Sequence, residues 1–278
     1  MSKTVLITGC SSGFGKLAAK TFQQEGWNVV ATMRSPHKET ELNQLDNVLV
    51  TRLDVTDQES VTQAVEQGME TFGSIDVLVN NAGYGGRALF EQFSEETIYG
   101  MYETNVFGLM RVSRAVLPIM RQQEGGTIIN VTSMGGLVGV PLLSVYSSTK
   151  FAVEGLSEAM AIEYAPLNIK VKTVAPGAFE TRFSANTDNN LQHGDEEVKA
   201  HAKKLSDHLN AVGARMRQQG GKEADPQDVA DIIYKCATTD TPIHNIVGAD
   251  AEMLIGMKNS MPHQAFLDQI AAMTVSQM

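Results

Sequence analysis

A tyrosine and a lysine four residues apart are the side chains of this sequence best suited to proton transfer. Tyr146 and Lys150 lie within the stretch Ser144–Glu154, and on a helix a spacing of four places both on one face. A phenol with a pKa of about 10 is a poor acid or base at neutral pH, but a nearby cation favours the phenolate and lowers that pKa. The pair could therefore shuttle a proton, although the same spacing also occurs on plain amphipathic helices.

A glycine-rich turn directly follows the first predicted strand and opens a helix. It reads Thr8-Gly-Cys-Ser-Ser-Gly-Phe-Gly15, a Gly-x-x-x-Gly-x-Gly spacing. Such a turn lets backbone N–H groups approach a pyrophosphate, and the helix N-terminus favours the anion. We expect a dinucleotide to contact this turn, and a glycine turn without a ligand is the alternative. The predicted contacts are Gly9, Ser11, Ser12, Gly13, Phe14 and Gly15.

The end of the second predicted strand bears on the choice between NAD and NADP. An NAD site usually presents a carboxylate there to the ribose 2′-hydroxyl, but this chain has Met33 followed by Arg34. A guanidinium can pair with a 2′-phosphate instead. We therefore expect NADP(H) in preference to NAD(H), with an ordinary surface arginine as the alternative.

Polar and small residues also follow the later predicted strands. Asp54 and Val55 could contact an adenine, although the aspartate could equally satisfy turn amides. The asparagines and the glycine of Asn80–Gly83 are common turn residues, but small residues at such a strand end would also let a ribose approach closely. Asn105 falls inside a predicted helix, where an asparagine needs a hydrogen-bond partner. The further candidates at the strand ends are Asn81, Ala82 and Gly83, and Ser133 after the fifth strand.

The elements that must position these residues alternate between strand and helix. Near-continuous apolar runs predict strands covered on both faces, as in a parallel sheet. The alternation predicts one doubly wound α/β domain, a Rossmann fold over residues 1–278. The predicted strands are Lys3–Thr8, Asn28–Met33, Val48–Leu53, Val77–Asn80, Thr127–Val131 and Lys170–Val174. Helix starts are predicted at the capping box Thr56–Glu59 and at Asp225-Pro226.

Two segments depart from this alternation. Residues 185–222 are polar and flanked by glycines, and they predict a helical insertion at the carboxyl edge of the sheet that either closes as a lid or forms a solvated surface helix. Residues 257–278 are rich in methionine and form a C-terminal extension, either a docking segment or a frayed end.

Composition narrows the classes of partner and location. A net charge of −10 without a basic run makes a nucleic acid an improbable partner. Only Cys10 and Cys236 are present, which favours a reducing compartment, and the six histidines are scattered, so no metal site is expected. No apolar run is long enough for a membrane span, and no signal-peptide pattern follows the first residues. We expect a cytoplasmic protein with no membrane partner.

Taken together, the motifs resemble those of the short-chain dehydrogenase/reductase family, and the match covers Lys3 to Ala251. Each motif is weak by itself, but their order and separation are highly specific. The residues from Gly135 to Glu154 are similar to the branch that holds hydroxysteroid and retinol dehydrogenases. The motifs are Thr8–Gly15, Asn80–Gly83, Asn105, Ser133, Tyr146 with Lys150, and Pro176-Gly177.

The resemblance implies a seven-stranded, mainly parallel sheet with helices on both faces, and a role for each catalytic candidate. Tyr146 matches the general acid/base, and Lys150 matches the residue that holds the nicotinamide ribose and lowers the phenol's pKa. Ser133 matches the residue that orients the substrate oxygen, and Asn105 the one that anchors a water in the proton relay. The family's loop beside the nicotinamide is matched by Pro176, Gly177, Phe179 and Thr181.

The resemblance also implies a substrate and an assembly. A carbonyl or alcohol would exchange a hydride with NADP(H), and apolar residues expected in the cleft favour an uncharged, hydrophobic compound. A homodimer or homotetramer through Glu95–Arg121 and Ser144–Leu167 is expected, with a monomer as the alternative. A non-catalytic NADPH sensor or scaffold, and an epimerase or dehydratase on the same fold, are the competing functions. The expected cleft residues are Tyr84, Met134, Leu137, Val138, Leu142, Leu143, Phe179 and Phe183.

Overall fold

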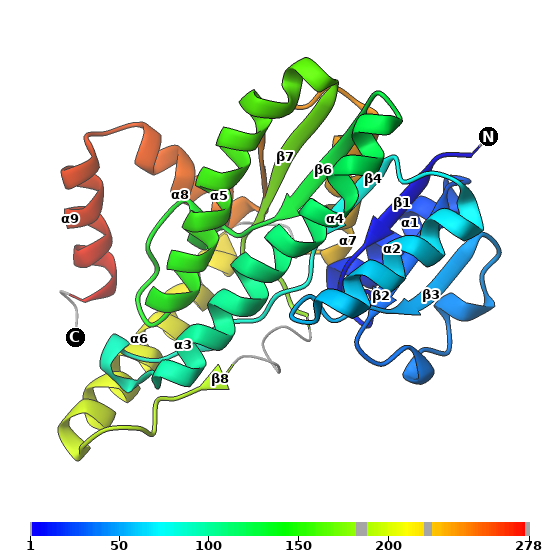
Figure 1. Cartoon of the computed structure of the whole chain (residues 1–278). Coiled ribbons are helices and arrows are strands. Elements are labelled where there is room, and N and C mark those ends of the chain that lie inside the picture. Colours follow the sequence, from blue (N-terminus) through cyan, green and yellow to red (C-terminus); the bar gives the residue numbers. More distant parts are fainter. Residues whose placement is uncertain (1, 182–187, 220–223, 276–278) are drawn as a thin grey trace.

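A computed structural model describes residues 2–181, 188–219 and 224–275 of the chain (Figure 1). Phe183 and the outer ends of the 185–222 insertion therefore lie outside the described residues. The central feature is a seven-stranded sheet in which every neighbouring pair is parallel. In sheet order the strands are β3 (Val48–Arg52), β2 (Asn28–Met33), β1 (Thr4–Ile7), β4 (Val77–Asn80), β6 (Gly126–Val131), β7 (Ile169–Pro176) and β9 (His244–Val247).

Helices cover both faces of this sheet, because successive residues of each strand point to opposite faces and both sets are apolar. In β1, Val5 and Ile7 belong to the core formed with α1 (Gly13–Gln24) and α7 (Pro226–Thr238). Leu6 belongs to the opposite core, formed with α2 (Gln58–Phe72), α4 (Leu109–Gln122) and α5 (Ser144–Tyr164). The predicted doubly wound Rossmann fold with a seven-stranded parallel sheet is confirmed.

The strand order reverses between β1 and β4, which are neighbours in the sheet although β2 and β3 intervene in the sequence. In open α/β sheets, ligands bind outside the carboxyl ends of the strands at such a switch point. The turns that follow β1, β4 and β6 all reach this edge. The predicted motifs at Thr8–Gly15, Asn80–Gly83 and Ser133 therefore come together at one edge of the sheet.

Helix starts were predicted with mixed accuracy. Asp225 caps α7 by accepting a hydrogen bond from the N–H of Gln227, as the sequence predicts. The predicted capping box at Thr56 is wrong by one residue. Asp57 is the N-cap of α2, and its carboxylate accepts from the N–H groups of Glu59 and Ser60, so Thr56 lies outside the helix.

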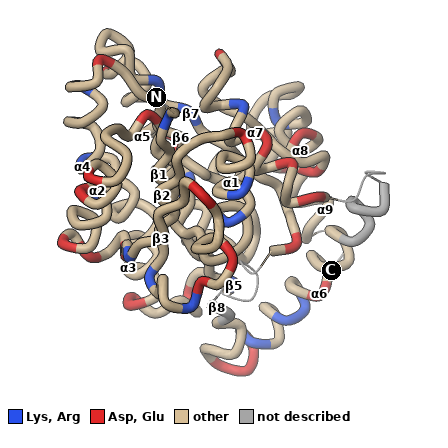
Figure 2. The backbone as a smooth tube through the Cα atoms, turned by 90° about the vertical axis from the view of Figure 1, so that its right-hand side faces the viewer, with Lys and Arg blue, Asp and Glu red and all other residues tan. Residues whose placement is uncertain are grey.

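The segments outside the layered sheet gather on one side of the molecule. There α6 (Glu196–Gln219) packs against α9 (His263–Thr274), and α8 (Ala249–Asn259) leads from β9 to α9 (Figures 1 and 2). A two-stranded ribbon joins β5 (Gly86–Arg87) to β8 (Asp188–Asn189). The helix α3 (Glu95–Tyr102) continues into α4 through a π-helical turn, Glu103–Gly108.

Charged residues of both signs are interspersed along the chain in the view of Figure 2. Within the described ranges, no helix has the length and apolar character needed to cross a membrane. The 24-residue helix α6 carries charged residues along its length.

Candidate active site

Tyr146 and Ser133 form the centre of the candidate site. Ser133 ends the turn after β6, and Tyr146 lies in the first turn of α5. The two side chains are hydrogen-bonded, and a Cβ placed on Gly135 would lie within 3.7 Å of both. Tyr146 is only 7% exposed and packs with Phe93 and Met101. Burial raises the pKa of its phenol to about 12, and the Ser133 hydrogen bond opposes that rise.

Lys150 lies one turn further along α5, on the same face as Tyr146. Its Nζ is 5.7 Å from the centroid of the Tyr146 ring and donates to the carbonyl oxygen of Val131 at 2.9 Å. Burial lowers the pKa of Lys150 to about 8, and the charge of Glu154 opposes that shift. Burial is the larger of these two effects on the phenol, and the lowering of its pKa by Lys150 that the resemblance implies stays a prediction.

Asn105 has the partners that its position inside a helix requires. It lies in the π-helical turn, is 1% exposed, and its Oδ1 accepts from the N–H of Tyr84 at 3.0 Å. Its Nδ2 donates to the carbonyl oxygen of Tyr84 at 2.9 Å and to Thr149 Oγ1 at 3.1 Å. Thr149 in turn donates to the carbonyl oxygen of Tyr146 at 2.7 Å. Asn105 thus ties the turn after β4 to the helix that carries Tyr146.

The glycine turn after β1 is packed tightly against the turn after β4. Gly9 has a φ of +76°, and a Cβ on Gly15 would lie 2.4 Å from Asn81 Nδ2 and 2.6 Å from the Gly9 carbonyl oxygen. Asn81 Nδ2 donates to the carbonyl oxygens of Thr8 and Gly9 at 2.9 and 3.2 Å. Thr8 Oγ1 accepts from the N–H groups of Asn81 and Ala82, both at 3.0 Å. Only glycine fits at position 15 without moving backbone atoms.

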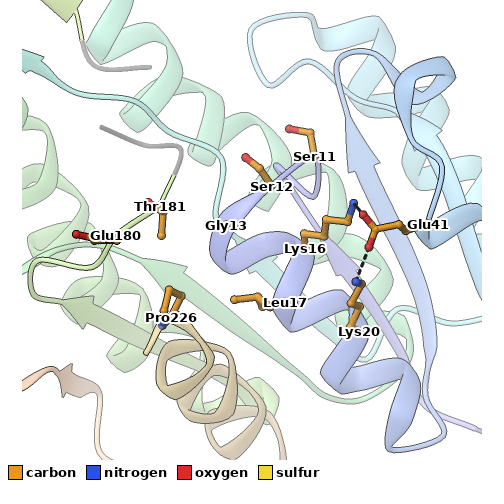
Figure 3. Close-up of a pocket in the computed structure, with 10 residues that line it drawn as sticks. All are labelled: Ser11, Ser12, Gly13, Lys16, Leu17, Lys20, Glu41, Glu180, Thr181 and Pro226. Atoms are coloured by element: carbon orange, nitrogen blue, oxygen red, sulfur yellow. Dashed lines mark hydrogen bonds and ion pairs between the residues drawn. The ribbon is translucent and has the colours of Figure 1, made fainter. Parts of the chain in front are cut away.

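The N-terminus of α1 opens into a cleft of about 670 Å³ (Figure 3). Ser12 is the N-cap, and its side chain makes no capping hydrogen bond. A helix N-terminus favours an anion, since its first N–H groups have no partner within the helix. Across the cleft, Thr181 lies close to Gly13, because a Cβ on Gly13 would be 3.6 Å from the threonine Cβ. Ser11, Ser12 and Gly13 therefore suit the pyrophosphate of a dinucleotide.

The loop after β7 reaches back toward this turn. Pro176 is the last residue of β7, and the N–H of Ala178 donates to Asp250 Oδ2 at 2.8 Å. Phe179 packs edge-on against Phe14, with ring centroids 5.6 Å apart. Gly177 leaves room for the Asp250 carboxylate, which a Cβ there would overlap. The structure thus brings together the residues predicted from the turn after β1 and from the loop after β7.

The residues predicted to surround the adenosine, Arg34, Asp54 and Val55, differ in their exposure and in their contacts. Arg34 is exposed in the loop after β2. Asp54 Oδ1 accepts from the N–H and the hydroxyl of Thr56, so this aspartate makes the turn contacts that were the alternative expectation. The side chain of Val55 is 6% exposed and lies in the core beside Gly108. Gly83 lies close to both Asn105 and Lys150.

Some residues expected to line the substrate cleft belong to the core. Val138 is 3% exposed and packs against Ile255 and Phe266 of the C-terminal helices, so the prediction that its side chain faces the cleft is wrong. The reason is that α8 and α9 dock on the 137–138 loop, where Lys258 Nζ donates to the carbonyl oxygen of Leu137 at 2.5 Å. Leu142 is also buried, at 4% exposure.

A group of charged residues beside the cleft was missed by the sequence reasoning. Lys16 pairs with Glu39 at 3.1 Å. Glu41 pairs with Lys16 at 2.8 Å and with Lys20 at 2.6 Å (Figure 3). Glu39 Oε1 also accepts from the N–H groups of Glu41 and Leu42. This network fixes the loop after β2 against α1. The i,i+4 spacing of the two lysines gives a weak sequence signal, but their partners are more than 20 residues away.

Comparison with known proteins agrees with this geometry. The short chain dehydrogenase family profile matches residues 3–192. The 3-ketodihydrosphingosine reductase of Bacteroides thetaiotaomicron is 44% identical over 69% of this chain and 70% of its own. Retinol dehydrogenase 8 of Bos taurus is 35% identical over 84% of this chain and 77% of its own.

Solved structures share the whole fold. A short-chain dehydrogenase from Streptomyces avermitilis superposes with a TM-score of 0.79 and 31% identity, covering 100% of this chain and 98% of its own. ElxO, solved with NADP bound, superposes with a TM-score of 0.73 and 30% identity, covering 91% of this chain and 100% of its own. The 3-ketoacyl-(acyl-carrier-protein) reductase of Brucella melitensis, solved with NADH, superposes with a TM-score of 0.74 and 26% identity, covering 90% of this chain and 98% of its own.

Proposed function

Because this chain belongs to the short-chain dehydrogenase/reductase family, we propose that it is an NADP(H)-dependent oxidoreductase that interconverts a carbonyl compound and its alcohol. The observation that carries the proposal is the hydrogen-bonded pair of Tyr146 and Ser133, with the Lys150 ammonium 5.7 Å from the phenol ring. These groups lie at the edge of the sheet where the glycine turn also lies. An acid, an orienting hydroxyl and a dinucleotide site are therefore combined.

Each of these side chains has a distinct role in the proposal. Tyr146 donates a proton to the developing alkoxide in reduction and accepts one in oxidation, while Ser133 donates a second hydrogen bond to the same oxygen. With a pKa of about 12, the phenol is protonated at neutral pH, as an acid must be. Oxidation requires the phenolate, which the Lys150 ammonium favours. Asn105 holds the turn after β4 against α5 and thereby positions Tyr146.

The cofactor fits the cradle formed by the turn after β1 and the loop after β7. Bound NADP(H) supplies or accepts the hydride. Its pyrophosphate would lie over Ser11, Ser12 and Gly13, and Ala82, Gly83, Pro176, Gly177, Phe179 and Thr181 would face the remainder. Asp54 and Val55 stay predictions for the adenine. A structural relative holds NADP, which supports the cofactor class.

Arg34 supports NADP(H) over NAD(H). Lys16 and Lys20, which line the cleft, are already paired with Glu41. Arg34 is exposed after β2, where a guanidinium can bind a 2′-phosphate through two hydrogen bonds. The family also contains members that use the unphosphorylated cofactor, and a relative was solved with NADH. A direct comparison of the two cofactors is therefore part of the test.

The proposed substrate is an uncharged, hydrophobic carbonyl or alcohol. Two relatives are named for substrates with long apolar parts, 3-ketodihydrosphingosine and retinol. Near Tyr146, the partly buried side chains of Tyr84, Ile98 and Leu143 contribute apolar surface. We propose that α6 covers this side of the site, since Arg87 donates to Asn210 Oδ1 of α6 at 3.0 Å.

The assembly and location stay predictions. We propose a homodimer or homotetramer that pairs through Glu95–Arg121 and Ser144–Leu167, because Phe107 of the π-helical turn and Phe151 of α5 are 50% and 42% exposed. A cytoplasmic location is proposed from the composition, which includes two buried free cysteines. Size-exclusion chromatography with light scattering tests the assembly.

Turnover with both cofactors tests the enzyme against the sensor or scaffold. Purified protein is mixed with NADPH or NADH and a panel of ketones and aldehydes that includes 3-ketodihydrosphingosine, and with NADP⁺ and retinol in the other direction. Loss or gain of reduced-cofactor absorbance, faster with the phosphorylated cofactor, supports the proposal. Tight NADPH binding without turnover of any compound would support the sensor instead. An isomerised product without net cofactor change would indicate an epimerase.

A further inference from the structure

A buried carboxylate lies one helical turn beyond Lys150. Glu154 follows Lys150 by four residues on α5, so both lie on the same face of the helix. Glu154 is 4% exposed and Lys150 is 5% exposed. A nearby opposite charge favours the ammonium form of a buried lysine, because little water screens it.

The Glu154 carboxylate contacts His244, the first residue of β9. Glu154 Oε2 lies 2.9 Å from His244 Nδ1, and His244 Nε2 lies 3.0 Å from Glu158 Oε1. Thr173 Oγ1 lies 3.2 Å from the same Nδ1. The side chains of His244 and Glu158 are 35% and 59% exposed. The sequence of groups Lys150, Glu154, His244 and Glu158 therefore leads from the buried interior to solvent.

Within the part of the chain that the structure describes, the second carboxylate oxygen of Glu154 lacks the hydrogen bond that a buried structural carboxylate normally has. Its Oε1 is buried and has no hydrogen-bond partner among the described residues. A buried carboxylate oxygen without a donor costs stability, and protonation or replacement by an apolar residue would relieve that cost. The charge of Glu154 nevertheless acts on Lys150, where it opposes the effect of burial.

We propose that Glu154 is a positioning residue for the reaction: its carboxylate keeps Lys150 in the ammonium form that faces Tyr146, and His244 holds that carboxylate in place. The inference rests on the proposed function, since the ammonium matters for the chemistry only if Tyr146 transfers a proton. The groups around Lys150 are Tyr146 and Glu154 on its own helix, the Val131 carbonyl oxygen on β6, and Asn105 beside Gly83.

A titration that requires neither substrate nor cofactor tests this inference. The side-chain NMR signals of Lys150 are followed with pH in lysine-labelled protein and assigned with Lys150→Arg. In Glu154→Gln the pKa of Lys150 should fall by roughly one pH unit, because an opposite charge has been removed. Glu154→Asp, which retains the charge, should titrate close to wild type, and so should Glu163→Gln, an exposed acid on the same helix.

If Glu154→Gln does not fold, Glu154→Met removes the same charge without burying an amide, and such replacements are often tolerated. An unchanged Lys150 titration in a folded, charge-neutral variant would overturn the inference. If the enzyme is active, alcohol oxidation can be compared in wild type and the charge-neutral Glu154 variant. The pH at which kcat/KM reaches half its limiting value should be roughly one unit higher in the variant. A uniform loss at every pH would indicate a structural role only. Absence of turnover in the wild type would refute the proposed function and leave the Lys150 titration as an independent result.

Discussion

The Nζ of Lys150 lies 5.7 Å from the centroid of the Tyr146 ring, and the two side chains are almost equally buried. Burial acts on them in opposite directions. It raises the pKa of the phenol to about 12 and lowers that of the amine to about 8. Both shifts favour the neutral forms, because desolvation penalises whichever form is charged. The charge state of this pair therefore depends on the groups around it.

Tyr146→Phe should abolish turnover while leaving NADPH binding within about threefold of wild type, because the phenol supplies a proton and little of the cofactor's contact surface. General acid catalysis contributes about 10²- to 10⁴-fold, so kcat should fall by at least 10²-fold. Tyr164→Phe, at the far end of the same helix, is the matched control and should leave kcat unchanged. Steady-state kinetics and fluorescence titration with NADPH measure the two quantities. An equal loss of binding and turnover would indicate that Tyr146 is structural.

Lys150 should make the stability of the protein depend on pH in the alkaline range. Between about pH 8 and 10.5 the unfolded chain binds a proton at Lys150 that the folded protein has lost. The contribution of Lys150 to the free energy of unfolding therefore rises with pH in this window, by an amount on the order of 3 kcal/mol. Lys150→Met lacks this group. The free energy of unfolding of wild type minus that of Lys150→Met should therefore become more positive as the pH rises.

Urea denaturation of both proteins at a series of pH values measures this difference. Taking the difference removes the titrations that are the same in both proteins. A difference that stays constant between pH 8 and 10.5 would contradict the lowered pKa of Lys150.

The sequence predicts the positions of the site residues well because a parallel sheet collects the carboxyl ends of its strands at one edge. The motif at Thr8–Gly15 and the residues Asn81 and Ser133 each follow a strand, so their convergence needs only the strand order. The spacing of Tyr146 and Lys150 is likewise local to one helix. The fold class could be predicted for the same reason, since apolar runs and helix periods are local signals.

Burial and long-range partners could not be predicted in this way. The pKa of Tyr146 depends on Phe93 and Met101, which pack beside it from distant segments. Val138 is core because helices more than 100 residues later cover it. Glu154 and His244 are 90 residues apart in sequence, and nothing in either local pattern indicates that they meet.

Arg34→Ala should weaken NADPH binding while leaving NADH binding unchanged. Hydrogen bonds to a charged group contribute about 1.5–3 kcal/mol, which corresponds to a roughly 10- to 150-fold increase in Kd for NADPH. Arg114→Ala, at an exposed position on α4, is the matched control and should alter neither cofactor's Kd. Isothermal titration calorimetry with both cofactors measures the effect. A parallel loss for NADPH and NADH would assign Arg34 to the shared part of the cofactor or to the fold.

Gly15→Ala should damage both stability and cofactor binding, because the added Cβ would lie 2.6 Å from the Gly9 carbonyl oxygen and 2.4 Å from Asn81 Nδ2. Relief requires the turn after β1 to move away from the turn after β4, and overpacking of this kind costs about 1–3 kcal/mol. The displaced turn would no longer present its N–H groups to a pyrophosphate, so NADPH affinity should fall at least 10-fold.

Gly256→Ala provides the contrast, since a Cβ on this glycine of α8 meets no atom within 4 Å. An alanine in an exposed helix interior stabilises by up to about 1 kcal/mol, and NADPH binding should be unchanged. Urea denaturation and NADPH titration of both variants test the pair. Wild-type affinity in Gly15→Ala would show that the close packing of Gly15 on Gly9 and Asn81 does not shape the cofactor site, and the glycine turn would then lose its assigned role.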